Sequence, residues 1–198
     1  MKLKNTFWIE GYVLRVLAYI RDSKKLSEVF YKLLVDGELY HHSINVCKIA
    51  TLLAIENKMS DADINNVCLA GLFHDVGKVF ISKDILYKPY KLTDEEFNII
   101  KKHPESGSEL LKSAGVNDEV VKMVLNHHEK YDGTGYPAGI VSKTIPEDII
   151  TTADIFSALT ENRVYHNALN IHEALSMLND CNNINKDMVA LLSSSIEE

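Results

Sequence analysis

Apolar residues recur every three or four positions along most of this chain, which is the spacing of one face of an α-helix. Ile44, Cys47, Ala50, Thr51 and Ala54 form one such stripe. Only 9 glycines and 4 prolines interrupt the 198 residues, whereas a protein with many strand turns normally carries more of both. The pattern therefore predicts an all-α protein, folded as a helical bundle, and argues against a β-sandwich.

Charge and cysteine content exclude several classes of function. The chain has 21 basic and 28 acidic residues, and its net charge of -7 opposes binding to a nucleic acid polymer. The apolar stretch 12–20 is interrupted by Arg15 and is too short to span a bilayer, so we expect no membrane segment. Cys47, Cys68 and Cys181 are far apart among apolar neighbours, which is typical of buried, reduced thiols in a cytoplasmic protein.

Local signals predict where individual helices begin and end. Ser60 and Thr93 start capping boxes, Pro146 suits a first helical turn, and Asn170 suits a cap. Pro104 disfavours helical geometry in the residue before it and predicts a break there. We therefore expect helices over residues 5–20, from 23 or 27 onward, 38–57, from 60 to Gly77, from 93 to the break, 104–115, 118–129, 146–160, from 170 onward and 187–192, with an irregular loop over 131–139.

Two segments place a carboxylate where a metal can bind it. His74 and Asp75 open the segment His-Asp-Val-Gly-Lys, which ends at Lys78, and one carboxylate can bridge two cations with its two oxygens. Asp154 lies in the apolar segment 149–158, where a buried carboxylate needs a partner. A metal is the partner we expect, and a buried salt bridge is the alternative.

Paired side chains add candidate ligands. Glu38 and His42 are four residues apart on an expected helix, so they share a face and can bind one metal centre, while His41 is an alternative partner for Glu38. His127 and His128 point in different directions on a regular helix, which suits two adjacent metals better than one. Each pair taken alone also fits an ordinary surface position.

Most of the chain resembles a known family. Its motifs occur in the order Glu38, His42-Ser43, His74-Asp75-Val-Gly-Lys78, Lys88-Pro89, Leu92-Thr93, His103-Pro104, His127-His128-Glu129, Asp132-Gly-Thr-Gly-Tyr-Pro137, Ala153-Asp154 and Arg163-Val-Tyr165. Over residues 36–192 this order closely resembles the HD-GYP domain, a subfamily of the HD phosphohydrolases. The resemblance implies an HD-type helical catalytic domain over residues 36–198. A short helical segment over residues 1–35 would precede it and either pack on it or form a homodimer.

The resemblance also implies an activity in bacterial second-messenger signalling. The chain would be a metal-dependent phosphodiesterase that converts cyclic di-GMP to linear pGpG and then to GMP, through a hydroxide that bridges two metals. Two or three divalent ions are expected, since members with Glu at the position of Glu38 resemble the versions holding three. Iron or manganese suits the ligands, and zinc is not excluded. The implied metal ligands are Glu38, His42, His74, Asp75, His103, His127, His128 and Asp154, with Asp75 as the bridge.

The same resemblance implies which residues contact the substrate. They are Lys78, Arg163, Gly133, Gly135 and Tyr136. The two cationic residues would contact phosphate, with Lys78 acting in catalysis as well, and the loop residues would shape the guanine pocket. Val164 and His166 stand where the family usually has Pro and a Lys or Arg, which lowers the affinity expected for the second phosphate.

Two other functions remain open from the sequence. One is an HD hydrolase of a different nucleotide, which would need neither the Gly-Tyr-Pro loop nor the second histidine pair. The other is a non-catalytic receptor that senses a cyclic dinucleotide or binds a diguanylate cyclase through the Gly-Tyr-Pro loop. The intact set of expected ligands argues against the receptor, because buried polar groups are costly to keep without a use.

Overall fold

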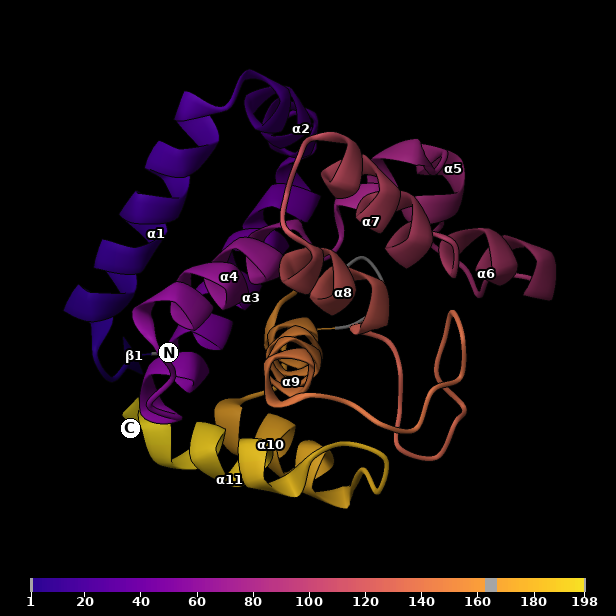
Figure 1. Ribbon diagram of the computed structural model, residues 1–198. Coiled ribbons are helices and arrows are strands. Elements are labelled where there is room, and N and C mark those ends of the chain that lie inside the picture. Colours follow the sequence, from indigo (N-terminus) through magenta and orange to yellow (C-terminus); the bar gives the residue numbers. More distant parts are fainter. Residues whose placement is uncertain (1, 163–166, 198) are drawn as a thin grey trace.

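The computed structural model describes residues 2–162 and 167–197, which form a bundle of helices (Figure 1). The α-helices are α1 (Thr6–Asp22), α2 (Lys24–Leu34), α3 (Gly37–Glu56), α4 (Asp61–Phe73), α5 (Lys83–Leu86), α6 (Asp94–Ile100), α7 (His103–Ser113), α8 (Asp118–Asn126), α9 (Ile145–Thr160), α10 (Ile171–Asp180) and α11 (Lys186–Ser195). A 3₁₀ helix, η1 (Val76–Phe80), follows α4. Two short strands, β1 (Lys2–Leu3) and β2 (Ile196–Glu197), pair antiparallel near the chain ends.

Side-chain caps start several helices where the sequence predicts them. Ser60 accepts a hydrogen bond from the backbone N–H of Asp63 at the start of α4. Thr93 begins α6 with a complete capping box, and Asn170 begins α10 in the same way. These caps satisfy backbone groups that a helix leaves unpaired at its first turn, so they set the chain positions at which the helices begin.

Helix α3 lies at the centre of the bundle and packs against α4 and α9. Its side chains Val46, Ile49 and Leu53 are fully buried in the core. Helices α1 and α2 cover one side of this centre, α7 and α8 lie on the other, and α10 and α11 pack below α9 in the view of Figure 1. This packing brings α3, the end of α4 and α9 together, and these elements carry several of the expected ligands.

The segment after α4 differs from its expected form. Helix α4 ends at Phe73, so the expectation that Gly77 terminates it is wrong. Gly77 lies instead within η1, where its Cα packs directly on the backbone of α7. The sequence signal of a glycine is the same for a helix end and for a close approach of two backbones, and only the packing distinguishes them.

The N-terminal segment shares the core of the remaining chain. Tyr12, Val16 and Ile20 of α1, together with Leu26 and Val29 of α2, belong to one buried apolar cluster with α3 and α4. The boundary at residue 35 stays a prediction.

The apolar stretch 12–20 lies inside α1. Across residues 2–162 and 167–197, none of the helices combines the length and the apolar character that membrane crossing requires.

Candidate metal centre

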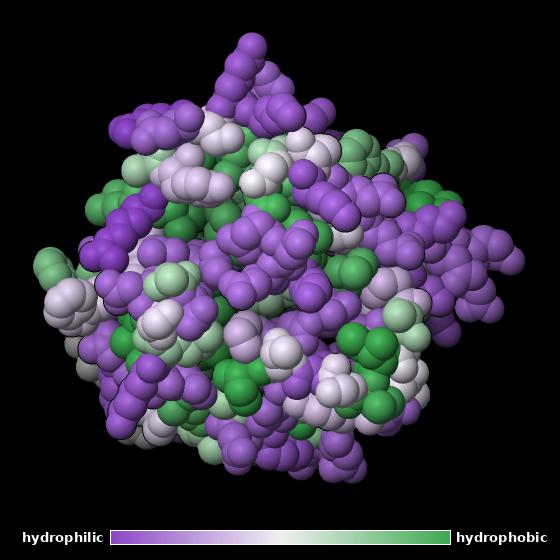
Figure 2. Space-filling model, viewed as in Figure 1, coloured by the Kyte–Doolittle hydropathy of each residue, from purple (hydrophilic) through white to green (hydrophobic). Residues whose placement is uncertain are grey.

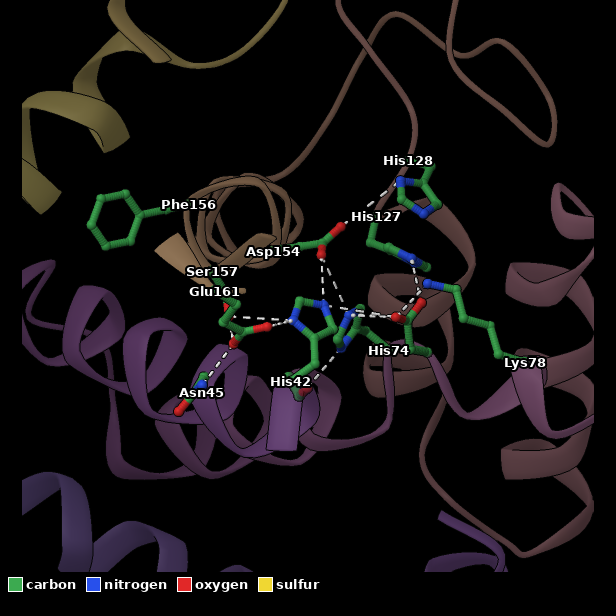
Figure 3. Close-up of polar contacts among 12 residues, drawn as sticks. His42, Asn45, His74, Lys78, His127, His128, Asp154, Phe156, Ser157 and Glu161 are labelled. Atoms are coloured by element: carbon green, nitrogen blue, oxygen red, sulfur yellow. Dashed lines mark hydrogen bonds and ion pairs between the residues drawn. The ribbon is translucent and has the colours of Figure 1, made fainter. Parts of the chain in front are cut away.

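The expected ligands other than Glu38 meet in one buried cluster. Figure 3 labels five of them, His42, His74, His127, His128 and Asp154. His42 comes from the first half of α3, and Asp154 comes from the middle of α9. The remaining ligands lie at helix ends: His74 and Asp75 after α4, His103 at the start of α7, and His127 and His128 after α8. Residues from five segments of the sequence therefore face one point of the bundle.

The cluster divides into two groups that share Asp75. The Oδ1 atom of Asp75 lies 3.1 Å from Nε2 of His103 and 3.9 Å from Nε2 of His127. Its Oδ2 atom lies 3.4 Å from Nε2 of His74 and 3.7 Å from Nε2 of His42. The two oxygens of one carboxylate thus face two different groups, which is the geometry of a bridging ligand.

Asp154 extends this arrangement from the side of α9. Its Oδ1 atom lies 3.0 Å from Nε2 of His42 and 3.6 Å from Nε2 of His74. Its Oδ2 atom lies 3.9 Å from Nδ1 of His128. Asp154 is therefore surrounded by imidazoles of both groups, and both expected partners, a metal and a buried salt bridge, stay open because His42 and His74 can each form the ion pair.

The orientation of three imidazoles fits a metal. Nδ1 of His74 lies 2.9 Å from the carbonyl of Gly71, and Nδ1 of His103 lies 2.8 Å from the carbonyl of Ile100. Nδ1 of His127 lies 2.7 Å from the carbonyl of Val124. Because a carbonyl only accepts, each Nδ1 carries the hydrogen and each Nε2 turns a lone pair toward the cluster in the neutral ring.

Two of these lone pairs face each other. The Nε2 atoms of His103 and His127 are 3.2 Å apart, although both neutral rings carry their hydrogen on Nδ1. Two lone pairs at this distance repel unless a cation lies close to both. In addition, Nε2 of His74 and Oδ1 of Asp75 are buried and have no hydrogen-bond partner among residues 2–162 and 167–197. The nitrogen and oxygen donors present therefore fit transition-metal ions such as iron, manganese or zinc.

Burial and mutual charge shift the protonation of the cluster. Burial lowers the pKa of His127 well below its ordinary value and lowers the pKa of His128 to about 3. Burial also lowers the pKa of His74, but the carboxylates of Asp75 and Asp154 outweigh it and raise that pKa to about 10. His127 and His128 are thus neutral at pH 7, and the neutral form is the one that binds a metal. His74, with its raised pKa, carries a proton on Nε2 in the metal-free protein and must release it to bind a metal.

The carboxylates are ionised despite their burial. Burial raises the pKa of Asp75, but the positive charges of Lys78 and His74 lower it by more than burial raises it. The pKa of Asp75 therefore lies well below its ordinary value. Burial likewise raises the pKa of Asp154, but the contacts with His42 and His74 have a larger, opposite effect. The pKa of Asp154 therefore also lies well below its ordinary value. Both carboxylates are therefore charged ligands at neutral pH.

Lys78 stands between the cluster and two hollows. Its Nζ atom lies 2.5 Å from Oδ2 of Asp75. One hollow, of about 340 Å³, is lined by Lys78, His42 and Asp75. The other, of about 350 Å³, is lined by Lys78, His128 and Asp154. Lys78 therefore places a cation beside the cluster and lines both hollows.

Glu38 lies near the cluster without joining either group. It is exposed on the first turn of α3 and lines the hollow that contains His42 and Lys78. Its assignment to a third metal stays a prediction.

Sequence reasoning missed Glu161, which lies just after α9 and contacts His42 through its carboxylate. The glutamate is 119 residues from its histidine, so no local pattern pointed to it.

The loop with the Gly-Tyr-Pro segment is held against the cluster. A Cβ atom on Gly135 would lie 2.5 Å from the backbone N of Lys130, so the loop packs closely on the residues after the histidine pair. The ring of Tyr136 is 4.6 Å from the ring of His128. Gly133 has a positive φ of 72°, which glycine adopts without strain. The loop thus places an aromatic ring at the edge of the metal cluster.

Glu129 holds this loop in place, a role that its position in the sequence did not indicate. It is fully buried, and its carboxylate accepts hydrogen bonds from the backbone N–H groups of Ala138, Gly139 and Ile140. A charged acceptor with three backbone donors stabilises one loop conformation. Arg163, the other expected phosphate contact, lies outside the described residues, as do Val164 and His166.

The sequence of this chain is similar to those of known proteins. The HD domain family model matches residues 28–187. A cyclic di-GMP phosphodiesterase of Pseudomonas aeruginosa is 37% identical over 150 residues, which cover 74% of this chain and 36% of that protein. A 3'3'-cGAMP-specific phosphodiesterase of Vibrio cholerae is 38% identical over 141 residues, which cover 70% of this chain and 31% of that protein. The chain therefore spans about a third of the length of these relatives.

Solved structures with the same fold include an HDG"Y"P protein from Bdellovibrio bacteriovorus, with a TM-score of 0.66 and 17% identity, covering 94% of this chain and 63% of that one. The HD domain of the L. monocytogenes phosphodiesterase PgpH has a TM-score of 0.64 and 17% identity, covering 84% of this chain and 94% of that one. At this level of identity the likeness concerns the fold, and it confirms the expected all-helical architecture.

Proposed function

The chain belongs to the HD domain family, in its HD-GYP branch, and on that basis we propose that it is a metal-dependent phosphodiesterase that hydrolyses cyclic di-GMP. The observation that carries this proposal is Asp75, whose two oxygens face two groups of ligating side chains. The P. aeruginosa relative, which is named a cyclic di-GMP phosphodiesterase, supports the choice of substrate. The loop with Tyr136 at the edge of the cluster supports it further.

The arrangement of these residues supports two ion positions. Asp75, His103, His127 and His128 would hold one ion, and His42, His74 and Asp75, with Asp154 beside them, would hold the other. Such ions supply a deprotonated water near neutral pH and positive charge beside phosphorus. Iron and manganese suit these ligands best and zinc is compatible with them, while a third ion would require Glu38.

Hydrolysis forms a bond from a water oxygen to phosphorus and breaks the bond from phosphorus to one ribose oxygen. The first cleavage opens cyclic di-GMP to linear pGpG, and a second gives GMP. Lys78 would stabilise the charge on the phosphoryl oxygens, since its ammonium group faces both hollows beside the cluster. Arg163 would bind phosphate, and the loop 133–136 would shape the guanine pocket, where the Tyr136 ring offers a stacking face.

Turnover of cyclic di-GMP is the direct test of this proposal. Protein reconstituted with Mn²⁺ or Fe²⁺ is expected to convert cyclic di-GMP to pGpG and GMP, which chromatography separates. Metal analysis of the same samples is expected to give two ions per chain, or three if Glu38 binds one. Binding of cyclic di-GMP without cleavage by metal-replete protein would identify a receptor instead.

A second substrate has specific support. The V. cholerae relative is named a 3'3'-cGAMP-specific phosphodiesterase and is as similar to this chain as the cyclic di-GMP enzymes are. The same assay with 3'3'-cGAMP as substrate compares the two candidates, and the higher kcat/KM identifies the preferred one.

Partners and location complete the proposal. A diguanylate cyclase would bind on the Gly-Tyr-Pro loop, which is followed by the exposed apolar side chains of Ile140 and Val141. The chain would act in the cytoplasm, in keeping with the buried, free thiols of Cys47 and Cys68.

A homodimer would form through α1, because this helix carries large apolar side chains on its exposed side as well as in the core. One face lies in the core, and the other exposes four large side chains, which are Phe7, Trp8, Leu14 and Tyr19. Figure 2 shows green and white atoms at the left margin, where Figure 1 places α1. A helix that exposes several large apolar side chains opposite its buried face is normally covered there as well.

A second copy of α1 fits this outer face. Phe7, Gly11, Leu14 and Ala18 follow the alternating four- and three-residue spacing of a coiled-coil seam. In an antiparallel pair, Phe7 lies opposite Ala18 of the other copy and Leu14 lies opposite Gly11, so large side chains meet small ones in both directions. Helix α1 carries two acidic and two basic residues, so its face adds no net repulsion between two copies.

Leu14→Glu is expected to convert such a dimer to a monomer. Loss of the apolar contact and burial of an unpaired carboxylate, repeated in both copies, raise the dimer Kd by at least about 100-fold. Analytical ultracentrifugation measures this change. Tyr90→Glu is the matched control, since Tyr90 is 75% exposed outside α1 and should leave the dimer intact. A wild-type chain that is monomeric at all concentrations would contradict the dimer and leave the face for a different chain.

A further inference from the structure

The Nδ1 atom of His42 has a different kind of hydrogen-bond partner from the Nδ1 atoms of three other expected ligands. His74, His103 and His127 each place Nδ1 against a carbonyl three residues earlier, at the end of a helix. Carbonyls in the last turn of a helix lack an intrahelical partner, so they are free to accept these bonds. His42 lies inside α3, where the helix uses its own carbonyls for backbone hydrogen bonds.

Glu161 supplies the partner that the backbone of α3 lacks. Its Oε2 atom lies 3.0 Å from Nδ1 of His42. The opposite ring nitrogen, Nε2, lies 3.0 Å from Oδ1 of Asp154 and 3.7 Å from Oδ2 of Asp75. The imidazole is therefore held between a carboxylate outside the cluster and the carboxylates inside it (Figure 3).

The carboxylate of Glu161 is itself held in place from two helices. Its Oε1 atom accepts hydrogen bonds of 2.6 Å from Nδ2 of Asn45 on α3 and of 2.6 Å from Oγ of Ser157 on α9. The hydroxyl of Ser157 also lies 3.3 Å from Nδ1 of His42. The side chain of Glu161 is 21% exposed and that of His42 only 7% exposed, so this contact is well shielded from water.

We propose that Glu161 is a positioning residue for the metal centre, a role that rests on the proposed metal-dependent function. Its carboxylate accepts the hydrogen of His42 Nδ1 and thereby keeps the Nε2 lone pair directed at the ion of the His42 group. The same anchors tie the start of α3 to the end of α9, the two helices that carry His42 and Asp154. A ligating histidine held by a carboxylate in this way binds its metal about 10–100-fold more tightly than one without it.

The test is a Mn²⁺ titration of the full chain, with a chelator as competitor. Glu161→Ala is expected to weaken one of two bound ions by about 10–100-fold and to leave the other close to its wild-type affinity. Glu161→Gln keeps a neutral acceptor for the His42 hydrogen and is expected to recover part of the loss. Glu109→Ala, which removes an exposed carboxylate from α7, is the matched control and should change neither affinity.

Two outcomes would overturn the proposal. Unchanged affinity of both ions in Glu161→Ala would show that His42 needs no such partner. An equal loss at both ions, together with a lower Tm of the metal-free protein and no recovery in Glu161→Gln, would show that the residue acts only on the fold. The titration uses no nucleotide, so a chain that fails to cleave cyclic di-GMP refutes the proposed function without affecting this result.

Discussion

Asp75→Ala is expected to lower turnover of cyclic di-GMP by at least about 10³-fold, the scale seen when a central electrostatic element of an active site is lost. The reason is geometric, because the two oxygens of this carboxylate face the two groups of ligands and no other described residue belongs to both. Its removal also leaves the ammonium group of Lys78 without its 2.5 Å partner. Single-turnover kinetics with saturating metal measures the chemical step directly.

Two companion variants make this result interpretable. Asp75→Asn keeps the shape of the side chain but removes its charge, so it should retain the fold and lose a similar part of the activity. Asp180→Ala removes an exposed carboxylate at the end of α10 and should leave turnover unchanged. Turnover in Asp75→Asn within tenfold of wild type would mean that the carboxylate is not a bridge.

Gly77→Ala is expected to destabilise the protein by about 3 kcal/mol, at the upper end of the cost of overpacking. A Cβ atom at this position would lie 2.0 Å from the carbonyl oxygen of His103 and 2.6 Å from the backbone N of Gly107. Both contacts are backbone atoms of α7, so no side chain can rotate away to make room. The helix that carries His103 must then move, and metal affinity should fall together with stability.

Guanidinium unfolding of the metal-free protein measures the change in stability. Gly37→Ala is the control, since a Cβ atom there meets nothing within 4 Å in the first turn of α3. That substitution should stabilise the protein by roughly 0.5–1 kcal/mol, because alanine loses less conformational freedom in a helix than glycine does. A Gly77→Ala protein as stable as wild type would contradict the close approach of η1 and α7.

The sequence alone determined the helical class, the starts of most helices and the candidate ligands. Ser60, Thr93 and Asn170 cap the helices they were expected to cap, because a cap depends on groups only three residues away. The full ligand set, including His103, was implied by the resemblance to the HD-GYP domain, while helical spacing and the cost of burying a carboxylate pointed to the other candidates. Such signals are local, and they remain valid whatever the rest of the chain does.

Only the tertiary structure decided how these ligands divide and what supports them. The sharing of Asp75 between two groups depends on the way α7, α8 and α9 meet after α4. The contact of Glu161 with His42 joins residues 119 positions apart. Gly77 is needed because the backbone of α7 lies against it, and not because of the conformation of its own helix. These features arise from the packing of helix on helix, and packing depends on the shapes of many side chains at once, which no short stretch of sequence contains.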